Sequence, residues 1–122
     1  PVSASPSTGT ERYEGMIKDD DVEKALDYLM RNAHIAAQAR ADRVYMEQYT
    51  KVVKARIMSE SNSLAINAQE RNALVDSRYL EQLEAERTAV FEDERHRFLR
   101  EAARAKLEAW RTEKATERAM AL

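Results

Sequence analysis

Two histidines, His34 and His96, are the side chains of this sequence best suited to acid–base or metal chemistry. His96 follows Asp93 by three positions, a spacing that brings an imidazole and a carboxylate together on one face of a helix. Di-iron helical bundles use a Glu-x-x-His pair on each of two helices. This chain has one Asp-x-x-His and no second copy, so only a pair of subunits would duplicate the motif. We expect no metal and no cofactor, and we interpret His34, between apolar positions, as an interface residue.

The second chemistry-bearing pattern is an acidic run, Asp19-Asp20-Asp21. Adjacent residues on a helix point in different directions, so three neighbouring carboxylates do not converge on one metal ion. Carboxylates in such a run are typical of a helix N-terminus, where they cap backbone N–H groups and face the positive end of the helix dipole. The sequence has no cysteine, no glycine-rich phosphate loop and no Ser/His/Asp arrangement. We therefore expect a protein that is not an enzyme.

Basic side chains form two stripes that could bind nucleic acid. A row of arginines can follow a phosphate backbone through charge and bidentate hydrogen bonds. A solvated face, or pairing with acidic segments of the same chain, is the alternative interpretation. On a helical wheel the stripe near the C-terminus spans roughly 60° and consists of Arg97, Arg100, Arg104, Arg111 and Arg118. The other stripe consists of Arg40, Arg43, Lys51 and Lys54, with Glu47 among them.

The distribution of helix breakers predicts an all-α fold. Both prolines and both glycines lie in the first fifteen residues, and a sheet protein would need them in its turns. Residues 1–18 are predicted to be a disordered tail, and residues 19–122 one helical domain. Apolar residues spaced by threes and fours predict a helix from about Val22 to Met58 and another from about Arg78 to Ala119. A polar turn at residues 59–63 and a short helix at about 65–74 connect them.

Charge patterning favours an antiparallel hairpin. Residues 1–30 carry a net charge of −4, residues 31–58 of +4, residues 59–94 of −6 and residues 95–122 of +4, within an overall charge of −2. Folding the two long helices back on each other would place acidic segments beside basic ones. No apolar run approaches the ~20 residues that a membrane span needs. We expect no membrane partner and a cytoplasmic location.

The long helices carry more apolar surface than one neighbour can cover. The main seam of the first helix is predicted to include Leu26, Ala37, Ala41, Tyr45 and Val52. A second apolar stripe accompanies the main one on each helix, whereas an ordinary amphipathic helix has one. We therefore expect a homo-oligomer formed by coiled-coil or bundle packing. The predicted interface consists of Ile35, Met46, Val53, Ile57, Phe98, Leu99, Leu107 and Trp110.

Two segments resemble a group of phage proteins. They are ADRVYMEQYTKVVKA and AQERNALVDSRYLEQLEAERTAVFEDERHRFLREAARAKLEAWRTEKATERA. The likeness is one of pattern over roughly residues 24–119, and it is to small helical proteins of phage replication and recombination modules, above all UvsY-type recombination mediators. It implies an oligomer in the host cytoplasm that binds single-stranded DNA and helps to load a recombinase. The matching basic residues are Lys51, Lys54 and Arg56. A helical adaptor or protein-binding regulator without nucleic-acid contact is the rival hypothesis.

Overall fold

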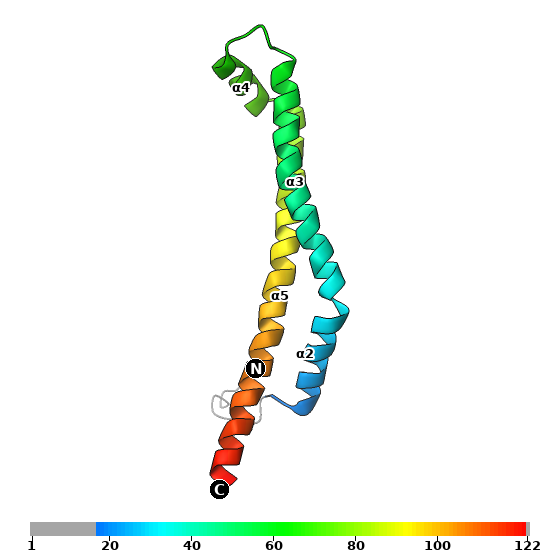
Figure 1. The fold of residues 1–122 in the computed structure, drawn as a ribbon, viewed down its shortest axis with the longest axis vertical. Coiled ribbons are helices and arrows are strands. Elements are labelled where there is room, and N and C mark those ends of the chain that lie inside the picture. Colours follow the sequence, from blue (N-terminus) through cyan, green and yellow to red (C-terminus); the bar gives the residue numbers. More distant parts are fainter. Residues whose placement is uncertain (1–16, 122) are drawn as a thin grey trace, which may run out of the picture. The chain divides into compact units, whose positions relative to one another are not determined.

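The computed structural model describes residues 17–121, and this part of the chain is all-α, as predicted (Figure 1). It contains α2 (Asp19–Arg31), α3 (Ala33–Ser59), α4 (Ile66–Leu74) and α5 (Ser77–Ala121), with no strand among the described residues. The predicted tail, residues 1–18, lies outside the described residues except for its last two positions. No helix in the described range is long and apolar enough to cross a membrane.

The first long helix is interrupted at Asn32, so the prediction of one continuous helix is wrong at this residue. The backbone N–H of Asn32 donates to the carbonyl of Tyr28 at 3.0 Å, and its side-chain amide donates to the same carbonyl at 3.1 Å. Asparagine side chains compete with the backbone for hydrogen bonds and so weaken helix interiors. The acidic run begins α2, where Asp21 Oδ2 accepts a hydrogen bond of 3.0 Å from the backbone N–H of Lys18.

The described part of the chain forms two compact units. One unit comprises residues 33–98, which include α3, α4 and the first half of α5. The other comprises, among the described residues, 17–32 and 99–121, which include α2 and the second half of α5. We call them the α3 unit and the α2 unit, and describe each by itself.

Helices α3 and α5 contact each other in antiparallel order within the α3 unit (Figure 1). Arg43 pairs with Asp93 at 3.3 Å, and Thr50 donates to Glu86 at 2.6 Å. Residue numbers therefore rise along α3 as they fall along the facing part of α5. The residues that α3 turns toward α5 alternate by three and four, which is the period of a coiled coil. We call these buried or half-buried positions the polar seam: Ala36, Ala39, Arg43, Met46, Thr50, Val53 and Ile57 on α3, and Tyr79, Gln82, Glu86, Ala89, Asp93 and His96 on α5.

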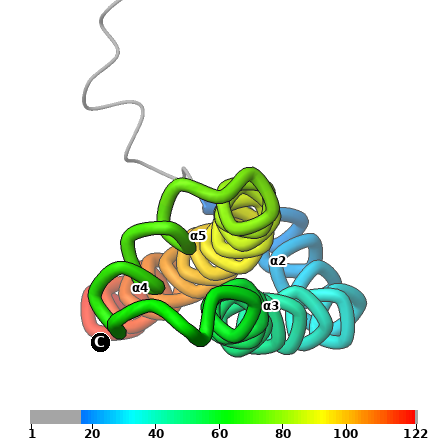
Figure 2. Tube along the Cα trace, turned by 90° about the horizontal axis from the view of Figure 1, so that it is seen from above, coloured from blue at the N-terminus to red at the C-terminus, as the bar shows by residue number. Residues whose placement is uncertain are grey.

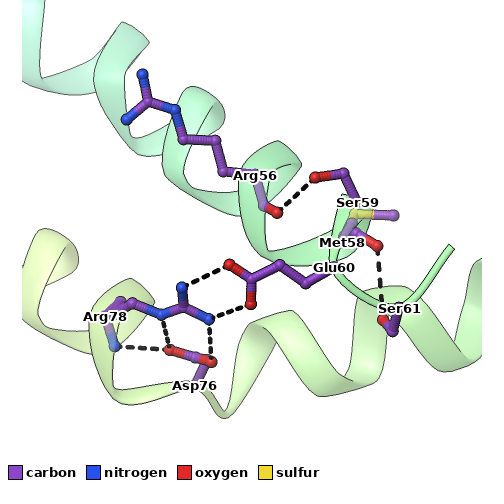
Figure 3. Close-up of polar contacts among 7 residues, drawn as sticks. All are labelled: Arg56, Met58, Ser59, Glu60, Ser61, Asp76 and Arg78. Atoms are coloured by element: carbon purple, nitrogen blue, oxygen red, sulfur yellow. Dashed lines mark hydrogen bonds and ion pairs between the residues drawn. The ribbon is translucent and has the colours of Figure 1, made fainter.

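Hydrogen bonds close the polar turn that was predicted at residues 59–63 (Figure 3). The Ser59 hydroxyl donates to the Arg56 carbonyl at 2.7 Å, and the Ser61 hydroxyl donates to the Met58 carbonyl at 3.5 Å. Carbonyl groups at the end of a helix lose their intrahelical partners. The Met58 carbonyl also accepts the backbone N–H of Ser61 at 3.2 Å. Helix α4 follows and lies against α3 (Figure 2), where Lys54 pairs with Glu70 at 3.4 Å.

An arginine joins the turn to the start of α5. Arg78 donates to both carboxylate oxygens of Glu60 at 2.8 Å, and also pairs with Asp76 at 3.0 Å (Figure 3). Asp76 in turn caps α5, because its Oδ1 accepts the backbone N–H of Arg78 at 2.8 Å. The hydrogen bonds from Arg78 lower the pKa of both Glu60 and Asp76 below their ordinary values.

The α2 unit is held by small residues and by one aromatic hydrogen bond. Ala25 of α2 and Ala103 of α5 are buried, which lets helices approach closely. Trp110 donates from its indole nitrogen to Asp19 Oδ1 at 3.1 Å, and the Lys114 ammonium lies 5.8 Å from the centre of the Trp110 ring.

The Arg78 cluster predicts a pH-dependent contribution to stability. Because the pKa values of Glu60 and Asp76 are lowered in the folded state, the stabilisation is present above the unfolded carboxyl pKa of about 4 and is lost as the pH falls through the folded values. We expect Glu60→Gln to lower the melting temperature by about 2 °C at pH 7, and to have little effect at pH 3. Circular dichroism melts measure this, with Glu101→Gln as control, since Glu101 forms no ion pair among residues 17–121. An equal loss at both pH values would contradict the assignment.

Candidate functional site: a helical association surface

A groove runs between α3 and α5 on one face of the α3 unit. Its larger part is a cavity of about 670 Å³ that includes three small residues, Ala39, Ala85 and Ala89, together with the large side chains of Tyr45 and Met46. The rest of its lining is His34, Ile35, Gln38, Asp42, Thr88, Glu92 and His96. Toward the turn, a second cavity of about 370 Å³ lies between the same two helices, lined by Tyr49, Val53, Arg56, Ile57, Arg78, Glu81 and Gln82.

Large apolar side chains of α3 stand beside the groove and remain exposed. Tyr45 is 63% exposed, and Ile35 and Val52 are exposed as well. The rings of Tyr45 and Tyr49 stack in parallel with their centres 5.9 Å apart. These residues belong to a set with the same three-and-four spacing as the polar seam, offset from it by one position. We call this set the groove stripe: Ile35, Gln38, Asp42, Tyr45, Tyr49, Val52 and Arg56.

Residues of the two predicted apolar stripes of α3 differ in how far α5 covers them. Tyr45 and Val52 were expected to be buried against the second long helix, but they are 63% and 41% exposed. Met46, Val53 and Ile57, which are predicted for an oligomer interface, belong to the polar seam and also line the groove, and Ile57 is 6% exposed. Alanines and a network of polar pairs on the seam allow α5 to approach the side of α3 that has the smaller apolar residues.

The arginine at the centre of the polar seam is surrounded by carboxylates. Arg43 donates to Glu47 at 3.2 Å, to Glu94 at 3.0 Å and to Asp93 at 3.3 Å. The hydrogen bond to Glu47 is the largest cause that raises the pKa of Arg43 above its ordinary value, and desolvation opposes it. Arg43 was predicted to bind nucleic acid, but its charge is engaged by three acidic side chains.

A second polar layer lies one heptad further along α3. Thr50 is buried, and its hydroxyl lies 2.6 Å from Glu86 Oε1 and 2.9 Å from the carbonyl of Met46. Gln82 donates from its amide to Thr50 Oγ1 and to the sulfur of Met46, both at 3.4 Å. Polar groups at seam positions of coiled coils are best known for setting register rather than for adding stability. The two layers, around Arg43 and Thr50, therefore determine which levels of α3 and α5 meet.

His96 is a buried side chain with one ring nitrogen that forms no hydrogen bond in the α3 unit. It is 6% exposed, and its Nδ1 is the one buried side-chain nitrogen or oxygen among the described residues that lacks a hydrogen-bond partner. The residue lines the groove. A buried unsatisfied polar atom is uncommon in native proteins, because it loses its hydrogen bonds to water without replacement.

The structure of residues 17–121 places no further metal-ligating side chains with the Asp-x-x-His pair. Asp93 and His96 both lie in the polar seam, and Asp93 is engaged by Arg43. No group of three or more potential metal-ligating side chains occurs within residues 17–121.

The predicted nucleic-acid residues differ in how far other side chains already engage them. Lys54 pairs with Glu70, Arg97 with Glu94 and Arg111 with Glu108. The guanidinium of Arg97 also lies 4.9 Å from the ring centre of Phe98, and that of Arg56 lies 6.0 Å from the ring centre of Tyr49. Within the described part of the chain, the predicted residues that form no ion pair are Arg40, Lys51, Arg56, Arg100, Arg104 and Arg118.

The remaining residues of the predicted interface are divided between the two units. Phe98 is exposed in the α3 unit, and Leu99 is exposed in the α2 unit. Leu107 and Trp110 are half-buried in the α2 unit, where Trp110 contacts Asp19. The exposure of Tyr45 and Val52 was missed. The signal that could have found them is the unbroken three-and-four spacing from Ala36 to Ile57, which becomes visible only when Arg43 and Thr50 are accepted as seam residues.

Comparison with known proteins gives no relative from which a function could be transferred, because no family model, curated protein or solved structure matches the chain.

The polar layer at Thr50 predicts a measurable stability effect. Thr50→Val keeps the side-chain shape but removes the hydroxyl shared by Glu86, Gln82 and the Met46 carbonyl, so we expect a loss of about 1 to 2 kcal/mol. Urea unfolding followed by circular dichroism measures it. Thr112→Val is the matched control: Thr112 also bonds the carbonyl four residues earlier, Glu108, at 3.1 Å, but is exposed. Equal losses in the two variants would show that the cross-helix contacts contribute nothing.

Proposed function

We propose that this protein is a non-enzymatic helical adaptor that works as an oligomer and recruits other proteins through helix–helix contacts. The observation that carries the proposal is the exposure of the groove stripe beside a polar seam. Tyr45, Ile35 and Val52 are exposed, while no large side chain is fully buried among the described residues. Contiguous exposed apolar surface of this kind typically marks an association site.

Energetic reasoning supports association. Full burial of one large apolar side chain contributes about 1.5–3 kcal/mol. In the α3 unit the buried apolar residues are Ala36, Ala39, Ala73 and Ile57, which are mostly small. A partner that covers the groove stripe therefore releases hydrophobic free energy that the α3 unit by itself does not use. We also include in this proposal the antiparallel hairpin over residues 19–122, which the alternating charge blocks favour.

A second candidate function is the mediator-like binding of single-stranded DNA, with a recombinase as a further partner. Arg104, Arg111 and Arg118 support it, because they are exposed on α5 at seven-residue intervals. The neutralisation of Arg43, Lys54 and Arg97 by carboxylates favours the adaptor instead. Phage origin, a recombination role and a cytoplasmic location belong to this second candidate as proposals.

Self-association should be sensitive to a charge in the groove stripe. We expect the wild-type chain to have at least the mass of a dimer in light scattering at micromolar concentration, and Tyr45→Asp to shift it toward monomer by weakening association about 30-fold or more, as burial of one large side chain implies. Phe91→Asp is the matched control, since Phe91 is 64% exposed but lines neither cavity of the groove. Monomeric wild-type protein would refute the oligomeric part of the proposal.

The two candidate functions make opposite predictions for single-stranded DNA. The adaptor proposal predicts no change in the fluorescence anisotropy of a labelled oligonucleotide at 50 mM salt, together with capture of a protein partner that nuclease treatment does not release. A mediator would bind, would weaken steeply with salt through counterion release, and would lose affinity in the variant Arg104→Gln, Arg111→Gln, Arg118→Gln. Salt-sensitive binding that this triple variant loses would replace the adaptor with the mediator.

A further inference from the structure

We propose that the groove of the α3 unit is a two-fold interface, in which two copies of this chain form an antiparallel four-helix bundle with each α3 against the partner's α5. The inference rests on the oligomeric part of the proposed function and specifies its geometry. Three observations carry it: the exposed groove stripe, the charges of the two helices, and the unsatisfied nitrogen of His96.

The charges of the helices select which helix lies against which. Helix α3 carries five basic and two acidic side chains, whereas residues 77–98 of α5 carry four basic and six acidic ones. A two-fold axis parallel to the helices places α3 beside the partner's α5, so that opposite net charges meet. A two-fold axis perpendicular to the helices would place α3 against α3 and α5 against α5, so that like charges meet.

The register of the α3 unit then gives the pairs of residues that meet. Contacts of Arg43 with Asp93 and of Thr50 with Glu86 define the level of each α3 residue on α5. An axis parallel to the helices keeps these levels unchanged between copies. Val52 then lies opposite Ala85 of the partner subunit, to within about one residue. A branched apolar side chain thus meets one of the small residues that line the groove.

The same register places polar side chains of one copy opposite polar side chains of the other that can pair with them. Arg56 lies at the level of Glu81 of the partner subunit, and neither forms an ion pair within residues 17–121. Tyr49 lies at the level of the partner's Thr88, so that two hydroxyl groups face each other. The groove surface is therefore complementary to a second copy of itself in charge as well as in shape, as a two-fold interface requires.

The second copy also supplies a partner for His96. The imidazole Nδ1 has none in the α3 unit, although the residue is 94% buried and lines the groove. On the groove stripe, Gln38 and Asp42 lie two residues on either side of its level, and Gln38 donates one amide hydrogen to Asp42 at 2.8 Å. An amide has two hydrogens, so Gln38 of the partner subunit retains one to donate to His96.

Cysteine cross-linking tests this geometry, because the chain has no native cysteine. The full-length single variants Val52→Cys and Ala85→Cys are mixed in equal amounts, one of them carrying an affinity tag, and oxidised mildly. Disulfides form only where the Cβ atoms come within about 4 Å. We expect a covalent dimer that contains both variants, about tenfold more abundant than the homotypic dimer of either variant alone. Circular dichroism confirms that both variants stay helical.

The control pair is Ala55→Cys mixed with Ala85→Cys, since Ala55 is exposed on α3 but, unlike Val52, does not belong to the groove stripe. This pair should give no mixed dimer. Light scattering on the wild-type protein separates the two ways in which the inference can fail. A monomeric wild-type protein would contradict both the oligomeric proposal and this geometry, and a different protein would then be the partner of the groove. A dimeric protein without the mixed cross-link, or with strong Val52–Val52 cross-links, would contradict this geometry alone.

Discussion

The packing of α3 on α5 in the α3 unit depends on hydrogen bonds and ion pairs between polar side chains that lie opposite each other on the two helices. Arg43 is surrounded by Glu47, Asp93 and Glu94, and one heptad further along Thr50 is shared between Glu86 and Gln82. Burying such groups costs free energy unless each one is bonded, so a slip of one residue along either helix would leave several of them unpaired. Specific polar pairing thus sets the register, while the apolar contribution of this seam to stability is small.

The polar seam has a direct consequence for the surface of α3. Polar side chains and alanines occupy most of the positions between the helices, while Ile35, Tyr45 and Val52 remain exposed on α3. The hydrophobic free energy of these side chains is not released within the α3 unit. A partner that covers these side chains binds only the folded chain and so stabilises it. In the proposed bundle, the free energy of folding is therefore linked to the free energy of association.

Carboxylates of the chain compete with the phosphates of a nucleic acid for the same arginine and lysine side chains. Arginine and lysine can neutralise either the phosphates of a nucleic acid or the carboxylates of their own chain, and here acidic residues three or four positions away, or on the facing helix, already pair with several of them. Exposed pairs of this kind are weak, so they do not prevent phosphate binding outright. They do reduce the gain from it, because each ion pair must be broken before a new one forms. Of the exposed arginines at seven-residue intervals in the second half of α5, Arg104 and Arg118 form no ion pair within residues 17–121, so this cost is absent for them.

The helical class, the polar turn after Ser59 and the Asp76 cap of α5 could all be predicted from sequence, because they depend on local chemistry. Glycine and proline are missing beyond residue 15, serines accept and donate hydrogen bonds at a helix end, and an aspartate caps the helix that follows it. The interruption at Asn32 is equally local, but one asparagine among helix-forming residues is too weak a signal to predict it. The side of α3 that faces α5 was decided only by the tertiary structure. The stripe with the larger apolar residues, which includes Tyr45 and Val52, was expected there, but close approach over alanines and pairing of Arg43 with distant carboxylates favour the neighbouring stripe. Such pairing joins residues about fifty positions apart, and periodicity within one helix carries no information about it.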